Sequence, residues 1–467
     1  MSSPKTHTST MGLVFRLNPI RSRFTHQCTI VGIVLCVALG SFSWVLAGIN
    51  YEEAPIHYRT TPPSNAITRL QDQIDKGQFR LEFDDQLGYL PSLLKALEVS
   101  PTTQVMPFAK ISRQNPKISP ETPRAIYFND DVHVGFVQDG LIEIAVTDPK
   151  LGMVFYTLDQ SPSGRPIFEN ESSSCLTCHG TARTRNVPGL QVRSVVPDLK
   201  GEPVVAAGSF RSDHSSPLEK RWGGWYVTGN HGTERHLGNL KLLDSKKPKS
   251  IDNSDGQNVM DLSSYFDTKK YLTPHSDIVA LMVLEHQADA LNFITIANFE
   301  TRHALYVQEQ QLQESGANAE RIHMATQAKI ANAGETLLNY LLFDNERMLQ
   351  HPLTGTSGFT DEFAKQGPFD IKGRSLRQFD LTKRIFKYPL SYTIYSKAFD
   401  ALPDEMKQYV YHQLSLRLDS KKGDSTTTRF DAETRQAILE ILRATKPEFE
   451  QLVLSKKIRS GEQNGND

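Results

Sequence analysis

The sequence predicts an α+β protein in which a β-rich domain precedes a mainly α-helical domain, with one apolar segment at the N-terminus. Three observations support this fold class. Short runs rich in Val, Ile, Tyr and Phe recur between turn signals in residues 116–240. Beyond residue 258, apolar residues recur at helical spacing over long stretches. A length of 467 residues, of which 38% are hydrophobic, is enough for two or three domains that each bury a core.

The N-terminus predicts an export segment. Residues 1–28 are basic and contain no Asp or Glu, and residues 29–49 carry no charge at all. An apolar run of about 20 residues can cross a bilayer as one helix, and the basic flank favours keeping residues 1–28 in the cytoplasm. Residues from 50 onward are then expected on the periplasmic side of the inner membrane. The length of the run favours an uncleaved transmembrane anchor, whereas Val45-Leu46-Ala47 matches a signal-peptide site whose cleavage near Ala47 would leave a soluble periplasmic protein.

Residues 50–115 predict a tether followed by a helix. Pro55, Pro62 and Pro63 suit an extended chain. The helix is indicated by leucines at mixed three- and four-residue spacing: Leu87, Leu90, Leu93, Leu94 and Leu97.

Residues 116–240 predict a β-rich domain. Breakers such as Asp139-Gly140 and Asp148-Pro149 divide its apolar runs, as expected for antiparallel hairpins. The predicted strands are Ala125–Phe128, Val132–Val137, Leu141–Val146, Met153–Leu158, Gln191–Val196, Val204–Phe210 and Trp225–Thr228.

The remaining residues predict a linker, a helical domain and a tail. Residues 241–258 are charged and poor in apolar side chains, which is typical of a connection between domains. Residues 259–445 form the predicted helical domain, and residues 446–467 a tail. The predicted helices are Ser276–Gln313, Ala317–Leu349, Leu381–Asp400, Asp404–Leu418 and Ala432–Leu442.

One motif carries chemistry. Cys175-Leu-Thr-Cys178-His179 has the spacing of covalent haem attachment, in which two thiols add to the two vinyl groups of one porphyrin and the histidine binds the iron. A zinc site would need another Cys or His pair, and the two other cysteines lie before or within the export segment. A thioredoxin-like dithiol would need a βαβ unit, whereas the stretch before Cys175 predicts a loop. The sequence therefore predicts one covalently attached haem c, with His179 as the proximal iron ligand.

The partners of that iron are less well defined. A metal-bound imidazole usually donates its other N–H to a carbonyl, and for His179 we expect Val187-Pro188-Gly189 to supply it or to be a simple loop turn. After His179 the first methionine is Met260, so the part of the β-rich domain that follows the motif, residues 180–240, offers no Met ligand. His231 is the preferred distal ligand because it lies in a Gly-flanked turn after an aromatic run. The alternatives are no protein ligand, or one of His214, His236, His275 and His286.

Four further stretches extend the likeness beyond the motif: Arg124–Asp131, Arg221–Gly229, His275–Gln287 and Phe386–Ser396. With Cys175–His179, they make the chain resemble a monohaem c-type cytochrome, and in particular a group of large exported bacterial proteins with one cytochrome c motif. At Leu237 the chain departs from that group, where a Met is expected, and this counts against a required Met ligand there.

The predicted function is haem-based electron transfer in the periplasm, with a redox partner protein that the sequence does not identify. A small-molecule sensor and a peroxidase-type enzyme, which would make the protein an oxidoreductase, are alternatives because an open coordination site on iron admits small molecules. The four basic residues of the first 28 leave a mildly acidic remainder, which is not the charge pattern of a nucleic-acid-binding protein.

Overall fold

The computed structural model describes residues 49–241, 252–419 and 430–452. The predicted export segment therefore lies outside the described residues, apart from residue 49. Among the helices that the structure describes, none is long and apolar enough to cross a membrane. Residues Gly48–Asp467 cluster as one compact unit.

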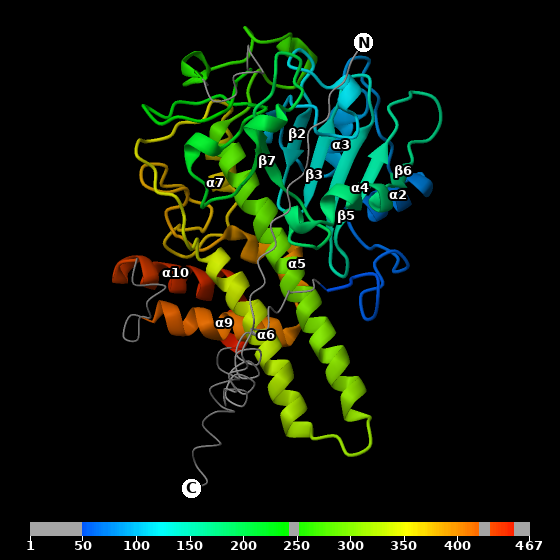
Figure 1. The fold of residues 1–467 in the computed structure, drawn as a ribbon, viewed down its shortest axis with the longest axis vertical. Coiled ribbons are helices and arrows are strands. Elements are labelled where there is room, and N and C mark those ends of the chain that lie inside the picture. The colour runs from blue at the N-terminus through cyan, green and yellow to red at the C-terminus, as the bar shows by residue number, and fades with distance from the viewer. Residues whose placement is uncertain (1–48, 242–251, 420–429, 453–467) are drawn as a thin grey trace, which may run out of the picture. The chain divides into compact units, whose positions relative to one another are not determined.

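A five-stranded antiparallel sheet occupies one side of this unit (Figure 1). Its strands follow chain order: β2 (Ala125–Phe128), β3 (Val132–Phe136), β4 (Ile142–Asp148), β5 (Gly152–Leu158) and β6 (Phe168–Asn170). The first four confirm the predicted hairpins, because β-branched and aromatic residues alternate between tight turns. The three-residue β6 carried too short a pattern to be predicted.

Two further pairs of short antiparallel strands are formed by segments that come before and after this sheet in the chain. They are β1 (Met106–Pro107) with β9 (Trp225–Tyr226), and β7 (Val192–Val195) with β8 (Ser209–Ser212). The predicted strand Val204–Phe210 is wrong over most of its length. Val205–Ala207 forms a 3-10 turn with Val205 90% exposed, and pairing starts only after Gly208, whose φ is 79°.

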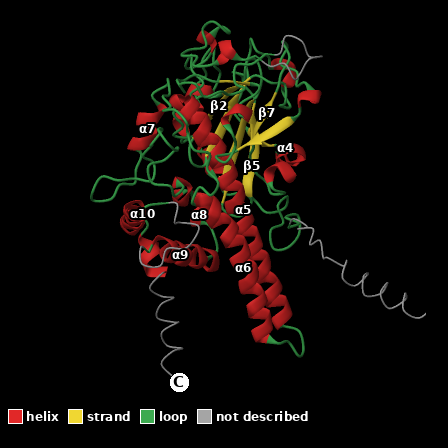
Figure 2. Ribbon diagram, turned by 60° about the vertical axis from the view of Figure 1, so that its left-hand side comes forward, coloured by secondary structure: helices red, strands yellow, loops and turns green. Residues whose placement is uncertain are grey.

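Helices dominate the second half of the chain, as predicted. A long helix, α5 (Ile278–Leu312), runs from the sheet to an antiparallel pairing with α6 (Ala319–Leu341) (Figure 2). The N-cap side chain of Asp277 starts α5 by accepting the backbone N–H groups of Val279 and Ala280. The other helices of this half are α7 (Phe359–Lys365), α8 (Lys397–Asp400), α9 (Asp404–Leu418) and α10 (Ala432–Thr445). The first half of the chain contributes three shorter ones: α2 (Ala66–Asp75), α3 (Leu90–Ala96) and α4 (Ser172–His179).

Three predicted segments differ from the structure. The helix predicted over Leu381–Asp400 reduces to a 3-10 turn at Tyr392–Tyr395 and the short α8, since Pro389 cannot donate a helical hydrogen bond. The tether is a packed segment in which Ile56 is buried. The first residues of the predicted tail are packed, since the Phe449 ring lies against Tyr411 with centroids 5.4 Å apart.

The linker at 241–258, of which residues 242–251 lie outside the described ranges, does not separate two compact units. Val134 of the sheet, Leu281 of α5 and Tyr411 of α9 belong to one continuous cluster of buried side chains. The apolar stripe of α5 therefore closes the core of the sheet as well as the core of the helices.

Candidate haem-binding site

The Cys-x-x-Cys-His motif lies on α4, which packs against β5. The loop predicted before Cys175 is correct for residues 161–166, whereas Phe168–Asn170 forms β6 and Ser172 to Ser174 already form the first turn of this helix. Cys178 and His179 follow Cys175 by three and four residues, and a helix places such residues on one face. The helical conformation therefore gathers both sulfur atoms and the imidazole on the same side of α4.

His179 is held in one tautomer. Its Nδ1 lies 2.9 Å from the carbonyl oxygen of Gly189. Because a carbonyl can only accept, Nδ1 carries the proton and Nε2 keeps a free lone pair. Burial lowers the pKa of His179, so the ring is neutral at pH 7. This confirms that the Val187-Pro188-Gly189 element supplies the carbonyl, and the residue that does so is Gly189.

The loop that carries this carbonyl is itself fixed from two sides. The N–H of Gly189 donates to the carbonyl of His179 at 2.9 Å. From α5, the Asn292 side chain accepts the N–H of Leu190 at 3.0 Å and donates to its carbonyl at 2.7 Å. Any side chain at residue 189 would overlap the amide of Asn292, which explains the glycine there. Helix α5 thus sets the orientation of the His179 ring.

A cavity of about 440 Å³ lies beside α4, and Cys175, Cys178 and His179 all line it. This volume falls in the usual range for sites that bind small molecules and cofactors. Cys175 is half-buried and Cys178 is exposed, so the cavity reaches the surface at Cys178. Its walls are largely apolar, and among the residues that line them are Ile126, Ala145, Phe155, Val192, Trp225, Leu284 and Ala288.

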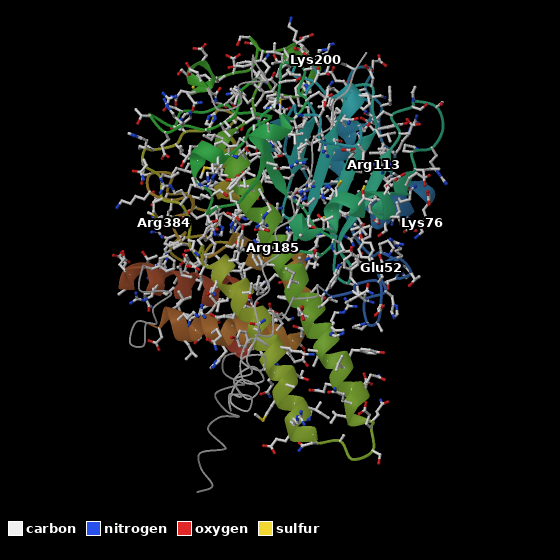
Figure 3. The ribbon with its side chains drawn as sticks, in the orientation of Figure 1. Glu52, Lys76, Arg113, Arg185, Lys200 and Arg384 are labelled. Carbon is white, nitrogen blue, oxygen red and sulfur yellow. The ribbon has the colours of Figure 1, made fainter. Side chains whose placement is uncertain are left out.

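Four arginines also line this cavity: Arg113, Arg124, Arg183 and Arg193. Arg124 pairs with Glu143 at 2.8 Å and has a buried Nε without a hydrogen-bond partner. Arg113 bonds Glu171 and Ser174 at the start of α4, and Figure 3 shows it on that side of the molecule. The two carboxylates of a porphyrin are the kind of group that such guanidinium ions bind.

One residue of the cavity was not among the candidates of the sequence. His133 on β3 is buried, and neither of its ring nitrogens has a hydrogen-bond partner among the described residues. Burial lowers its pKa to about 3. In the sequence, His133 is a single polar residue in a strand of alternating pattern, which gives no sign of a binding role. The register of the sheet places its side chain on the face that lines the cavity.

The structure does not bring His231 to this cavity. Its Nε2 accepts the N–H of Asn258 at 3.1 Å, and its ring packs against His236 with centroids 4.7 Å apart. His214 and His286 bond each other at 2.9 Å in the core. None of these four, nor His275, lines the cavity, so the geometry does not support His231 as distal ligand. The expected aromatic wall is present in part, through Trp225.

The four stretches that extend the resemblance meet around residues 285–287 of α5. Glu285 forms a fully buried ion pair with Arg221. Gln287 donates to the carbonyl of Asn129 at 2.7 Å and accepts the hydroxyl of Tyr392 at 2.6 Å. The residues directly before and after this triplet, Leu284 and Ala288, line the cavity. The network therefore fixes the wall of α5 that faces the motif.

Comparisons with protein-family models, with curated proteins and with solved structures find no match for this chain. Within the described residues, no group of three or more His, Cys, Asp and Glu side chains is placed to hold a metal ion directly.

Proposed function

We propose that this protein is an exported monohaem c-type cytochrome that transfers electrons to or from a redox partner protein. One observation carries the proposal: two thiols and an imidazole with a free Nε2 line a single cavity of about 440 Å³. The sequence spacing alone would also fit a chance pair of cysteines, whereas a shared apolar cavity is what a covalently held porphyrin requires.

Each group around the cavity has a role in this proposal. Addition of the Cys175 and Cys178 S–H groups across two vinyl double bonds would form two thioethers and fix the ring. His179 would hold the iron through Nε2, with its N–H bond to Gly189 increasing the basicity of the ligand. The apolar walls would exclude water and thereby tune the reduction potential. When bound, haem would supply a centre that accepts and releases one electron.

The exposure of Cys178 favours electron transfer at the surface. A thioether at this position would bring one edge of the porphyrin to the protein surface, where a partner can approach without entering the cavity. Residues 29–49 would direct the protein across the inner membrane. As an uncleaved anchor they would hold it on the periplasmic side of that membrane, and as a signal peptide cleaved near Ala47 they would leave it soluble in the periplasm.

The test is expression of the full chain in a bacterium that carries a cytochrome c maturation system. We expect haem to stay with the denatured chain after acidified acetone extraction, at one haem per chain by the pyridine haemochrome spectrum. The C175A/C178A double variant should lose it, and the matched C28A/C36A variant should keep it. A colourless wild-type protein, or haem retained by C175A/C178A, would refute the proposal.

The electron-transfer part needs its own measurement. We expect the haem of the wild-type protein to be reduced and reoxidised reversibly in a redox titration, with the same spectrum recovered after each cycle and no loss of haem. Turnover of hydrogen peroxide at the iron would instead support the peroxidase alternative. Fractionation of the expressing cells should place the haem protein in the periplasm or the inner membrane.

A further inference from the structure

His133 is a buried polar side chain whose ring stacks on Phe128, with centroids 6.1 Å apart. Its exposure is 6%, and both ring nitrogens lack a hydrogen bond among the described residues. A buried imidazole normally satisfies at least one nitrogen, since an unmet polar group inside a protein is unfavourable. Both ring nitrogens of His133 are therefore left to bind a group in the cavity.

The register of the sheet places this ring on the same face as the motif. His133 pairs with Ala145, and Ala145 pairs with Phe155. Directly paired residues project to one face of a sheet, so the three side chains form a row across β3, β4 and β5. The Phe155 ring packs against His179 with centroids 5.0 Å apart.

The middle of that row is nearly empty. Strands are spaced by about 4.8 Å, which separates His133 from Phe155 by about 10 Å along the row. The only side chain between them is the methyl group of Ala145, and all three residues line the cavity. A planar group that packed with one edge against Ala145 would lie between the two histidines, with His179 facing one side of its plane and His133 facing the other.

The chemistry of the two rings suits that arrangement. No hydrogen bond fixes the tautomer of His133, so either nitrogen is available as an electron-pair donor. Burial keeps the ring neutral at pH 7 by lowering its pKa, and neutral imidazole is the form that binds iron. Iron would then bind a nitrogen that has no hydrogen-bond partner among the described residues.

We infer that His133 is the second axial ligand of the haem iron, opposite His179. This inference rests on the proposed haem site and makes it more specific. Two strong protein ligands leave no open position on the metal, so the assignment selects electron transfer over small-molecule sensing and peroxidase chemistry.

The test uses the full-length haem protein. We expect the wild type to be six-coordinate and low-spin in both oxidation states, with the near-infrared and electron paramagnetic resonance signature of two histidine ligands and no binding of carbon monoxide. In H133A, we expect loss of the low-spin ferric spectrum and a gain of carbon monoxide binding. Haem should remain covalently attached in this variant, because both cysteines are unchanged.

Two further variants keep the test decisive. H133G with added imidazole should regain the low-spin spectrum, because free imidazole can occupy the space of the lost ring. H231A is the matched control and should keep the wild-type spectrum. If H133A and H133G fail to accumulate, a wild type that lacks the two-histidine signature would still overturn the assignment.

The outcomes separate this inference from the proposed function. The role of His133 would be overturned by a wild type that is five-coordinate or that shows a histidine–methionine signature, and also by an unchanged low-spin spectrum in H133A. Each of these outcomes would leave the covalent haem in place. Absence of covalent haem from the wild type would overturn the proposed function itself.

Discussion

Asn292 connects the stability of the fold to the orientation of the proposed iron ligand. Its side chain bonds both the N–H and the carbonyl of Leu190, next to the Gly189 carbonyl that holds His179. Asn292→Ala removes both bonds and leaves two backbone groups of Leu190 to find other partners. Each costs about 1–3 kcal/mol when it is buried and unmet. Leu190 is half-buried, which reduces the cost, so we expect a total loss of about 2–3 kcal/mol.

The assay combines denaturant unfolding with spectroscopy of the haem protein. Asn292→Ala should lower the free energy of unfolding by the stated amount and also shift the reduction potential, because the His179 ring loses its fixed carbonyl. Asn298→Ala is the matched control. Asn298 is a buried asparagine on the same helix, and it donates to the carbonyls of Ala401 at 3.1 Å and Pro149 at 3.5 Å, neither of which belongs to the loop that holds His179. It should lower stability without a change in potential. An equal shift in both variants, or none in Asn292→Ala, would refute the reasoning.

Three substitutions and one change of pH test other parts of the structure. Cys178→Ser should leave haem attached through Cys175 alone and move the pyridine haemochrome band to longer wavelength, since one vinyl group stays unsaturated; an unmoved band would contradict this. Arg221→Met removes the cation that pairs with the buried carboxyl of Glu285 and should lower the free energy of unfolding by about 3–5 kcal/mol in denaturant unfolding. Lys76→Met removes an exposed ion pair with Asp72 and should cost less than about 1 kcal/mol. Equal losses of unfolding free energy in Arg221→Met and Lys76→Met would contradict the role given to burial. Burial lowers the pKa of His214 to about 4, so the unfolded chain gains a proton below about pH 6.5 before the folded protein does; stability measured by urea unfolding should fall from pH 6.5 toward pH 4, and a constant value would contradict this.

The elements that local pattern could predict are those whose burial repeats along the chain. The β2–β5 meander and α5 were predicted to within a few residues, because alternation and helical periodicity record which face is buried. Val204–Phe210 and Leu381–Asp400 failed where apolar composition was present without burial of a regular face, or where proline interrupted the backbone. The two predicted domains share one cluster of buried side chains, because α5 is buried on nearly all sides over residues 278–299 and packs against both the sheet and the other helices.

The sequence by itself determined the Cys-x-x-Cys-His motif, the histidine that we propose as iron ligand and the loop that orients it, because these depend on spacing within about fifteen residues of one chain segment. Tertiary structure alone decided which other side chains share the cavity. His133 lies 46 residues from His179 in the sequence, as the residue numbers show, and reaches the site only through the register of three strands, whereas His231 follows an aromatic run but packs elsewhere. Contacts between distant segments depend on how the sheet and α5 close over one core, and no local pattern records that closure.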